Sequence, residues 1–308
     1  MSRPDFVTDA QIETRITLHG GAGCRCPLHQ RRLFTELLLG AGACAALPAL
    51  AREGVDVGGN SPFTKLASAA QIEQSAQQQY LQLSHEASSK GALAGANHPQ
   101  VIRLRAIARR IIPYTYEWNS RARDWKWEVN LIGAQELNAF CMPGGKIAFY
   151  QGILAQLQLS DDEVAMIMGH EMAHALREHA RERIGKRKAT NGFIAGLAAF
   201  FGWGELGRTL AGAGGDFLNL EFSRENESEA DLVGMELAAR AGYNPRAGIT
   251  LWQKMMAASK GAPLQFLSTH PSSDNRIKDI EANLPKVEGL YSRAAKPDQR
   301  FGPPKAGA

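Results

Sequence analysis

The chain has 308 residues, of which 44% are hydrophobic and 21% are charged, so it can bury a sizeable core and is neither fibrous nor wholly disordered. Its 35 Lys and Arg against 31 Asp and Glu leave a formal net charge of +4. That balance is too mild and too evenly spread to indicate a nucleic-acid-binding protein, so we expect no nucleic-acid partner.

Residues 1–51 are predicted to be an export signal with an upstream extension. Arg31-Arg32 precede a short apolar stretch, and small residues lead to Ala49-Leu50-Ala51, an A-x-A cleavage pattern. The Arg-Arg-x-Phe sequence also resembles a twin-arginine signal. Cys44 is a second possibility, as the lipid acceptor of a lipoprotein. We therefore predict a periplasmic protein, with a lipid anchor or outer-membrane partners as its routes to the membrane.

Residues 52–98 are predicted to form an N-terminal helical segment. Within 63–90, apolar side chains recur at helical spacing and glutamines occupy the opposite face. The apolar positions are Ile72, Ala76, Tyr80 and Leu83.

A second helix over 101–112 and a small β-sheet follow. The helix places Ile102, Ile107 and Ile111 opposite arginines, and Pro113 ends it. Residues 125–131 alternate as a half-buried strand, and 137–142 and 146–150 indicate two more strands around a Pro-Gly-Gly turn.

The next predicted helix begins with a capping box, in which Ser160 caps the helix and Glu163 reaches back to it. We expect this helix to run to about residue 188. The Gly- and Ala-rich stretch 192–215 indicates either a mobile lid or hairpin over the site or ordinary packed helices. Further helices are expected over 223–240, 244–259 and 273–284, and the polar tail 293–308 is expected to be disordered.

The helix that begins at Ser160 carries a metal-site pattern. His170 and His174 are four residues apart, so both imidazoles lie on one face and can bind one zinc ion. Glu171 lies about 100° round the helix from His170, where its carboxylate can hold a water molecule and act as a general base. The inner side of this helix is apolar, so the imidazole pair needs polar partners.

A third ligand is expected from the helix over 223–240, since catalytic zinc usually has three protein ligands. Glu227 and Asp231 share one face of that helix, and Glu225 and Glu229 share another. Spacing alone leaves both pairs open.

Taken together, these motifs resemble the zinc metallopeptidase family that includes HtpX, BepA, LoiP and the mitochondrial Oma-type proteases. The resemblance covers about residues 100–284 and is nearest the compact periplasmic members. The motifs that carry it are His170-Glu171-x-x-His174, Ser223-Arg224-x-x-Glu227-x-x-Ala230-Asp231, Asn138-Ala139-Phe140, Pro143-Gly144-Gly145-Lys146-Ile147, Thr269-His270-Pro271-Ser272-Ser273 and Arg276-Ile277.

The resemblance implies an α+β, zincin-like fold over 99–292, mainly helical, with a small antiparallel-containing sheet before the motif helix. It implies one zinc ion per chain, with Glu227 as the third ligand and Asp231 holding a ligand histidine in place. It also implies a substrate-binding edge strand, formed by Asn138, Ala139, Phe140 and Cys141. We expect Cys141 to be a small packed residue and not a nucleophile.

His270 has two functional interpretations. It stabilises the oxyanion of the tetrahedral intermediate, or it acts as a fourth zinc ligand that blocks water, as the self-inhibited members of the family suggest. His179 is five residues after His174 and among charges, so we expect it to be exposed.

We hypothesise a zinc metalloendopeptidase that cleaves misfolded or misassembled cell-envelope proteins. One alternative is a chaperone-like assembly factor whose site His270 keeps closed. Another is a structural zinc module, against which Glu171 argues because a structural site has no use for a base beside its ligands.

Overall fold

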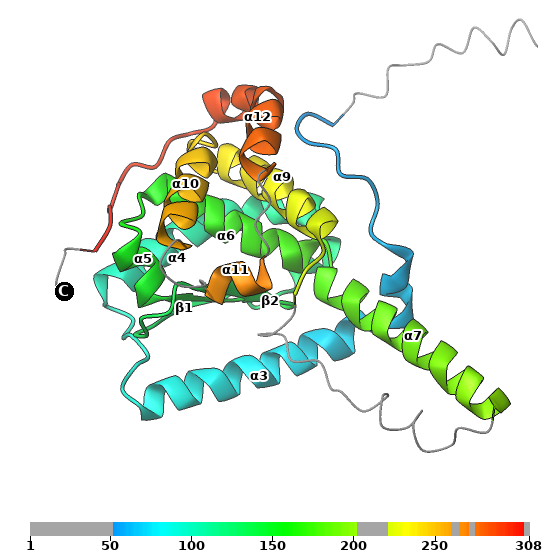
Figure 1. The fold of residues 1–308 in the computed structure, drawn as a ribbon. Helices are drawn as coiled ribbons and strands as arrows, with labels where there is room; N and C mark the ends of the chain where they lie inside the picture. Colours follow the sequence, from blue (N-terminus) through cyan, green and yellow to red (C-terminus); the bar gives the residue numbers. More distant parts are fainter. Residues whose placement is uncertain (1–51, 202–220, 260–264, 271–274, 305–308) are drawn as a thin grey trace, which may run out of the picture. The chain divides into compact units, whose positions relative to one another are not determined.

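Figure 1 shows the computed structural model, which describes residues 52–201, 221–259, 265–270 and 275–304. The predicted export signal and Cys44 lie outside the described residues. The sheet strands are β1 Glu128–Ile132, β2 Ala139–Met142 and β3 Lys146–Tyr150. The helices are α3 Ala69–Ser89, α4 Pro99–Ile111, α5 Gln151–Gln156, α6 Asp161–Leu176, α7 His179–Phe201, α9 Arg224–Arg240, α10 Ala247–Ser259, α11 Gln265–Thr269 and α12 Arg276–Arg293, with short 3-10 turns at Pro62–Leu66, Ile112–Glu117 and Ser120–Arg123.

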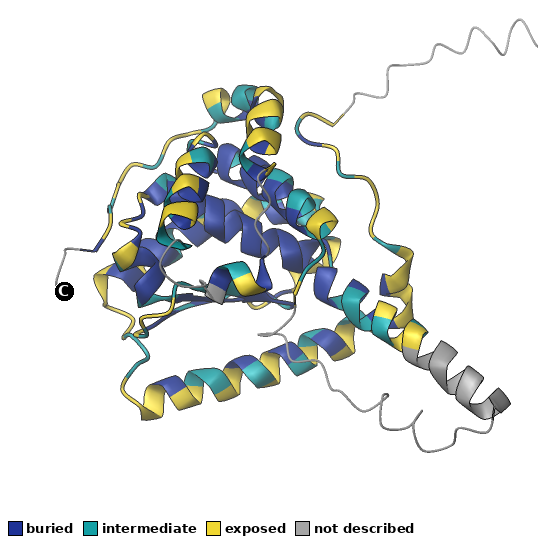
Figure 2. Cartoon of the chain, in the orientation of Figure 1, coloured by how far each residue is buried: buried dark blue, intermediate teal, exposed yellow. Residues whose placement is uncertain are grey.

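The three strands form one mixed sheet in the order β1-β3-β2, so β2 lies at an edge. β1 is parallel to β3, and β2 is antiparallel to β3 with Cys141 opposite Ile147. Because successive side chains of a strand point to opposite faces, Ala139 and Cys141 join the core beside α6, whereas Met142 packs with Tyr80 of α3. Figure 2 shows the buried residues concentrated in α6 and the sheet. The predicted mainly helical α+β fold with a small sheet is confirmed.

Helices α6 and α9 cross closely because two glycines face each other. A Cβ atom added to Gly169 would lie 2.6 Å from the carbonyl oxygen of Gly234, and one added to Gly234 would lie 2.5 Å from the backbone nitrogen of His170. A larger side chain at either position would separate the two backbones. The crossing therefore brings the histidines of α6 next to the carboxylates of α9.

Most predicted elements are confirmed, with different ends. β1 begins at Glu128 and not at Trp125 because its partner β3 has only five residues to pair with, and Trp125 packs on Trp127 with ring centroids 5.3 Å apart. The last helix, α12, continues past Pro285 to Arg293. The short helices α5 and α11 have no counterpart in the prediction.

The predicted orientation of α4 is wrong at two positions. Ile102 is 43% exposed, whereas Arg103 is fully buried. Arg103 donates hydrogen bonds to Asp161 at 2.7 Å and to the carbonyl of Leu159 at 2.6 Å. A buried guanidinium is tolerated when its charge and its N–H groups have partners, and here the ion pair ties α4 to the first turn of α6.

The single helix predicted over residues 160–188 is wrong, because two helices occupy this stretch. α6 ends at Leu176, Glu178 adopts a left-handed φ of 57°, and α7 begins at His179. No Gly or Pro marks this break, so the usual signals of a helix end are missing. In an uninterrupted helix His179 would lie about 140° round the axis from His174; the break turns it back towards α6.

The disordered tail predicted from residue 293 is also wrong for 293–304. The backbone N–H groups of Phe301 and Gly302 donate to the carboxylate of Asp161 at 2.7 and 3.1 Å, and Arg300 pairs with Asp162 at 2.8 Å. The polar, Gly/Pro-rich composition predicted disorder, but these contacts fix the segment against the start of α6. Residues 305–308 lie outside the described part.

Helix α7 extends to Phe201 and so covers the first part of the predicted lid segment. Residues 202–215 of that segment are outside the described residues, so the lid is an untested prediction. Among the helices that the structure describes, none combines the length and hydropathy that a membrane span requires.

Candidate metal centre

Helix α6 presents the motif residues at the boundary of the core. The capping box at its start is formed as predicted: the Glu163 N–H donates to the Ser160 hydroxyl at 3.3 Å, and the Ser160 N–H donates to the Glu163 carboxylate at 2.8 Å. His170 and His174 lie on one face, with ring centroids 4.7 Å apart. Both rings and the carboxylate of Glu171 are buried.

Four buried side chains converge here: His170 and His174 of α6, Glu227 of α9, and His270, which follows α11. The Nε2 atoms of His170 and His174 are 3.1 Å apart, and His270 Nδ1 is 3.2 Å from His170 Nε2. Glu227 Oε1 is 3.0 Å from His270 Nδ1 and 3.3 Å from His174 Nε2. We refer to these four residues as the donor cluster.

The chemistry of the donor cluster fits a metal ion. The Nδ1 atom of His170 faces Asp231 at 3.0 Å, and that of His174 faces His179 at 2.9 Å. When each Nδ1 carries the proton, the two Nε2 atoms direct lone pairs at one another across 3.1 Å, which is unfavourable unless a cation lies between them. Four ligands at about 2.0–2.1 Å from a tetrahedral ion lie about 3.3–3.4 Å from each other, close to the spacing in the cluster.

The structure distinguishes the two pairs of acidic residues on α9. Glu227 is 1% exposed and points into the donor cluster, and Asp231 bonds His170 at its outer nitrogen. Glu225 is exposed to solvent, and Glu229 faces the start of α7. The pair Glu227 and Asp231 thus lies at the site, and the other pair does not.

Arg276 of α12 is a site residue to which the sequence analysis assigned no role. It donates to both oxygens of Asp231 at 2.6 and 2.7 Å and to Glu227 Oε2 at 2.7 Å. Its guanidinium lies 3.7 Å from the ring centroid of Trp252. The Arg276-Ile277 motif indicated that this residue matters, but its spacing along the chain could not predict contacts with Asp231 and Glu227 of α9.

The two buried carboxylates of α9 both have lowered pKa values. Burial raises the pKa of Asp231, but Arg276 and His170 outweigh it and hold the pKa below its ordinary value. Burial likewise raises the pKa of Glu227, and the neighbouring His270 and His174 bring it well below its usual range. Both groups are therefore carboxylates, as metal ligands and their partners need to be.

Glu171 lies beside the donor cluster and is only 2% exposed. Burial raises the pKa of its carboxyl group above the ordinary value, with His270 and His170 acting in the opposite direction. Its Oε1 atom is 3.5 Å from His270 Nε2 and has no hydrogen-bond partner among the described residues. A buried oxygen without a partner marks a place for a water molecule or a substrate group.

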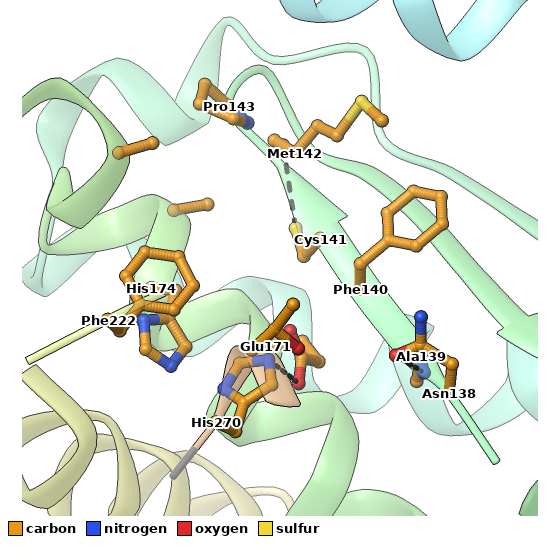
Figure 3. A pocket seen from close by; sticks show the side chains of 13 residues that line it. Asn138, Ala139, Phe140, Cys141, Met142, Pro143, Glu171, His174, Phe222 and His270 are labelled. Carbon is orange, nitrogen blue, oxygen red and sulfur yellow. Dashed lines mark hydrogen bonds and ion pairs between the residues drawn. The ribbon is translucent and has the colours of Figure 1, made fainter. Parts of the chain in front are cut away.

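Strand β2 forms one wall of the pocket that opens onto this site. Figure 3 shows Asn138, Ala139, Phe140 and Cys141 along the strand, across from Glu171 and the histidines. The cavity has a volume of ≈ 40 Å³. Burial raises the pKa of the Cys141 thiol, which suits a packed side chain and not a thiolate nucleophile.

His270 follows α11 directly and is one of the four residues of the donor cluster. Its ring stacks on Phe266, with centroids 4.5 Å apart and an interplanar angle of 20°. Burial lowers the pKa of His270, but the carboxylates of Glu171 and Glu227 raise it above its ordinary value overall. Of the two interpretations of His270, its place among the donors favours the fourth ligand.

The expectation that His179 is exposed is wrong. His179 is 2% exposed, and its Nδ1 atom lies 2.9 Å from Nδ1 of His174. Its Nε2 atom is 3.4 Å from the carboxylate of Glu229. Only the break at Glu178 brings this residue back towards α6, which the helical spacing could not indicate.

Comparison with known proteins identifies relatives of the chain. A family model described as "Peptidase family M48" matches residues 100–284. The chain is 37% identical over 194 residues to the mitochondrial metalloendopeptidase OMA1 of Schizosaccharomyces pombe, covering 62% of this chain and 55% of that protein. It is 28% identical over 205 residues to the metalloprotease LoiP of Escherichia coli (66% and 78%), and 29% identical over 180 residues to the β-barrel assembly-enhancing protease of that bacterium (54% and 36%). The chain thus spans about half the length of the first of these relatives.

The relative with 37% identity contradicts the periplasmic location predicted from the N-terminus, since it is named as mitochondrial. An Arg-containing stretch with apolar and small residues is compatible with more than one targeting route, so the pattern did not determine the compartment. The resemblance of the motifs to the metallopeptidase family is confirmed over the range in which it was predicted.

Proposed function

The chain belongs to peptidase family M48, a family of metalloproteases, and from this we propose that it is a zinc-dependent endopeptidase. The observation that carries the proposal is the position of Glu171. Its buried carboxylate lies beside the donor cluster with one oxygen unpartnered among the described residues, in a pocket that an edge strand lines. That combination is what water-mediated peptide hydrolysis needs.

We assign His170, His174 and Glu227 to holding the ion. Zinc held by these residues would act as a Lewis acid, polarising a peptide carbonyl and making water more acidic. Asp231 fixes the ring of His170 through the 3.0 Å contact at Nδ1. Arg276 holds Glu227 by its Oε2 atom at 2.7 Å, which leaves Oε1 directed at the histidines.

Glu171 acts as the general base in this proposal. It accepts a proton from the attacking water and later delivers it to the nitrogen of the departing amine. Burial raises the pKa of its carboxyl group and so makes the carboxylate a stronger base. The cavity of ≈ 40 Å³ beside it has room for a water molecule.

We propose that substrate binds as an added strand on β2, over Asn138–Cys141. β2 is an edge strand, and its residues line the same pocket as Glu171. Recognition of an extended backbone tolerates many sequences, because the hydrogen bonds are made by main-chain groups. The substrates are therefore segments that have lost their own structure, which means unfolded or misfolded proteins.

Within this class we propose misassembled proteins of the cell envelope as substrates and partners. The support is the name of one relative, the β-barrel assembly-enhancing protease. In proteolytic quality control, β2 would accept substrates of many sequences, and the buried, restricted pocket would exclude proteins that remain folded.

The position of His270 favours a second candidate, a latched assembly factor with little proteolysis. His270 Nδ1 is as close to Glu227 Oε1 (3.0 Å) as a ligand of the same ion would be. A cluster of four protein donors is also the pattern of a structural zinc site, but Glu171 and the pocket argue against a purely structural role. His270→Ala separates the candidates: it raises casein cleavage if His270 is a latch, whereas unchanged cleavage removes the latch.

Glu171→Gln tests the main proposal, because it removes the base and keeps the shape of the side chain. We expect the variant to bind zinc in the same proportion as the wild type and to lose casein cleavage. Glu136→Gln, the same change on an exposed side chain, is the control and is expected to cleave normally. Cleavage by the Glu171→Gln variant at the wild-type rate would refute the assignment.

A further inference from the structure

We propose that His179 and Glu229 are positioning residues that orient His174 through a relay of one hydrogen bond and one ion-pair contact. The inference rests on the metal site proposed above. The relay runs from His174 Nδ1 to His179 Nδ1, 2.9 Å away, and from His179 Nε2 to Glu229 Oε2, 3.4 Å away. His174 and His179 are 3% and 2% exposed, so water does not replace these contacts.

The tautomers along the relay follow from the geometry. His174 directs Nε2 at the donor cluster, 3.1 Å from His170 Nε2, so its proton lies on Nδ1. The atom that receives this proton is His179 Nδ1, which therefore has none of its own. The proton of His179 then lies on Nε2, which has no hydrogen-bond partner among the described residues and faces the carboxylate of Glu229 at an ion-pair distance of 3.4 Å. His174 thus donates at Nδ1 and keeps its Nε2 lone pair for the ion, whereas His179 accepts at Nδ1 and presents its own proton to Glu229.

Both ends of the relay are anchored. The guanidinium of Arg177 bonds Glu229 through Nε and donates through Nη2 to the carbonyl of Gly58 at 2.8 Å. Phe222 stacks on the ring of His174, with centroids 3.9 Å apart and an interplanar angle of 27°. The carboxylate and the metal-facing ring therefore each have one preferred orientation.

The relay parallels the arrangement behind the other histidine of α6. His170 faces Asp231, and Arg276 holds Asp231 through both oxygens. The order in that case is imidazole, carboxylate, arginine; behind His174 it is imidazole, imidazole, carboxylate, arginine. The additional imidazole connects His174 to Glu229 of α9, and the helix break at Glu178 brings it into place.

The relay is expected to increase the affinity of the site for the metal ion. Partners that fix a ligand imidazole are worth about 10–100-fold in metal affinity. His179→Leu keeps a similar volume and removes the acceptor for His174. His179→Asn keeps an acceptor, because the amide Oδ1 stands where the imidazole Nδ1 stands. His85→Leu, at an exposed histidine, is the matched control.

The test measures the zinc dissociation constant of each variant by competition with a chromophoric chelator, and the thermal stability of each zinc-free protein. We expect His179→Leu to weaken zinc binding about 10–100-fold, and His179→Asn and His85→Leu to stay within about threefold of the wild type. Equal affinity of His179→Leu and wild type, or equal losses in both His179 variants, would overturn the relay. If the wild type itself binds no zinc, the proposed function fails and not only the relay.

Imidazole ¹⁵N chemical shifts in the zinc-loaded wild type provide a second measurement that needs no variant. We expect His174 to be protonated at Nδ1 and His179 at Nε2. A proton on Nδ1 of His179 would contradict the relay even if a His179 variant failed to fold. Glu229→Leu, with Glu225→Leu as its exposed control on the same helix, tests the outer end in the same affinity assay; we expect weaker zinc binding in Glu229→Leu alone, and an unchanged affinity in that variant would remove Glu229 from the relay.

Discussion

Gly169 and Gly234 face each other where α6 and α9 cross, so closely that a Cβ atom on Gly169 would lie 2.6 Å from the Gly234 carbonyl oxygen. His170 follows the first glycine directly, and Glu227 and Asp231 precede the second by seven and three positions. The distance between the two backbones at this point therefore determines whether nitrogen and oxygen donors from different helices can meet at one ion.

Gly234→Ala is expected to impair the fold and the metal site together. The added methyl group would lie 2.5 Å from the backbone nitrogen of His170, so the helices must separate. Overpacking of this kind costs about 1–3 kcal/mol in the free energy of unfolding, and the shift carries Glu227 away from the histidines. Urea unfolding and zinc titration measure the two effects.

The control for this change is Gly289→Ala, which is also inside a helix. Its nearest neighbours are the flexible ends of Arg293 and Glu53, at 3.2 and 3.3 Å, which can move aside. Alanine is favoured over glycine in a helix by about 1 kcal/mol, so this variant should be neutral or more stable. A Gly234→Ala variant as stable as Gly289→Ala would contradict the role of the close crossing.

Glu227→Gln is expected to reduce zinc affinity by at least about tenfold, since even residues that only contact a ligand contribute about 10–100-fold. The change removes the negative charge from the donor cluster and keeps the volume of the side chain. Glu225→Gln, two residues earlier and exposed, should bind zinc as the wild type does. Metal content after dialysis measures both variants. A loss of metal in Glu225→Gln alone would show that the ligand lies on the other face of α9.

The residues of α6 were predictable because their arrangement is local. The capping box at Ser160 and the four-residue spacing of His170 and His174 depend only on helix geometry, and both are found as predicted. The choice of Glu227 over Glu225 was not predictable from the residues alone. It depends on how α9 is rotated against α6, which tertiary packing determines.

His179 and Arg103 show what else sequence reasoning missed. His179 reaches His174 only because a left-handed residue, Glu178, breaks the helix without a glycine or proline to announce it. Arg103 occupies a core position because Asp161, 58 residues away, neutralises it. Patterns of apolar residues treat both side chains as solvent-exposed, since the partners that make burial favourable are distant in the chain.

Glu163 is expected to make the stability of the protein depend on pH. Burial raises its pKa, but Lys254, the N–H of Ser160 and Thr250 outweigh burial, and the pKa in the folded protein lies below the ordinary 4.5. A carboxylate with a lowered pKa stabilises the fold above its unfolded pKa, and this stabilisation is lost as the pH falls through the folded pKa.

Glu163→Gln should therefore lower the free energy of unfolding by about 1–3 kcal/mol near neutral pH, because it leaves Lys254 without its charged partner. The difference from the wild type should shrink as the pH falls below 4.5. Urea unfolding at a series of pH values measures this, with Glu136→Gln as the exposed control. A difference that stays constant down to acid pH would mean that charge at Glu163 is not the cause.

The backbone of β2 leads to a prediction about substrates. The carbonyl of Asn138 accepts the N–H of Tyr150 on β3 at 3.0 Å. Backbone groups alternate in an antiparallel pair, so those of Ala139 and Cys141 point to the open edge. The N–H of Ala139 is bonded to the side chain of Asn138 at 2.9 Å, which leaves the Ala139 carbonyl and both backbone groups of Cys141 for a bound peptide.

A peptide that adds to this edge as a strand makes hydrogen bonds through every second residue. We therefore expect a series of substrate peptides, each N-methylated at one amide, to show kcat/KM values that alternate along the chain. Each lost hydrogen bond should reduce kcat/KM by about 2–10-fold, corresponding to about 0.5–1.5 kcal/mol. Peptides methylated at the intervening amides serve as the controls within the same series. Equal losses at all positions, or none, would mean that substrate does not bind as a strand on β2, because a strand exposes its amides to the partner with a period of two.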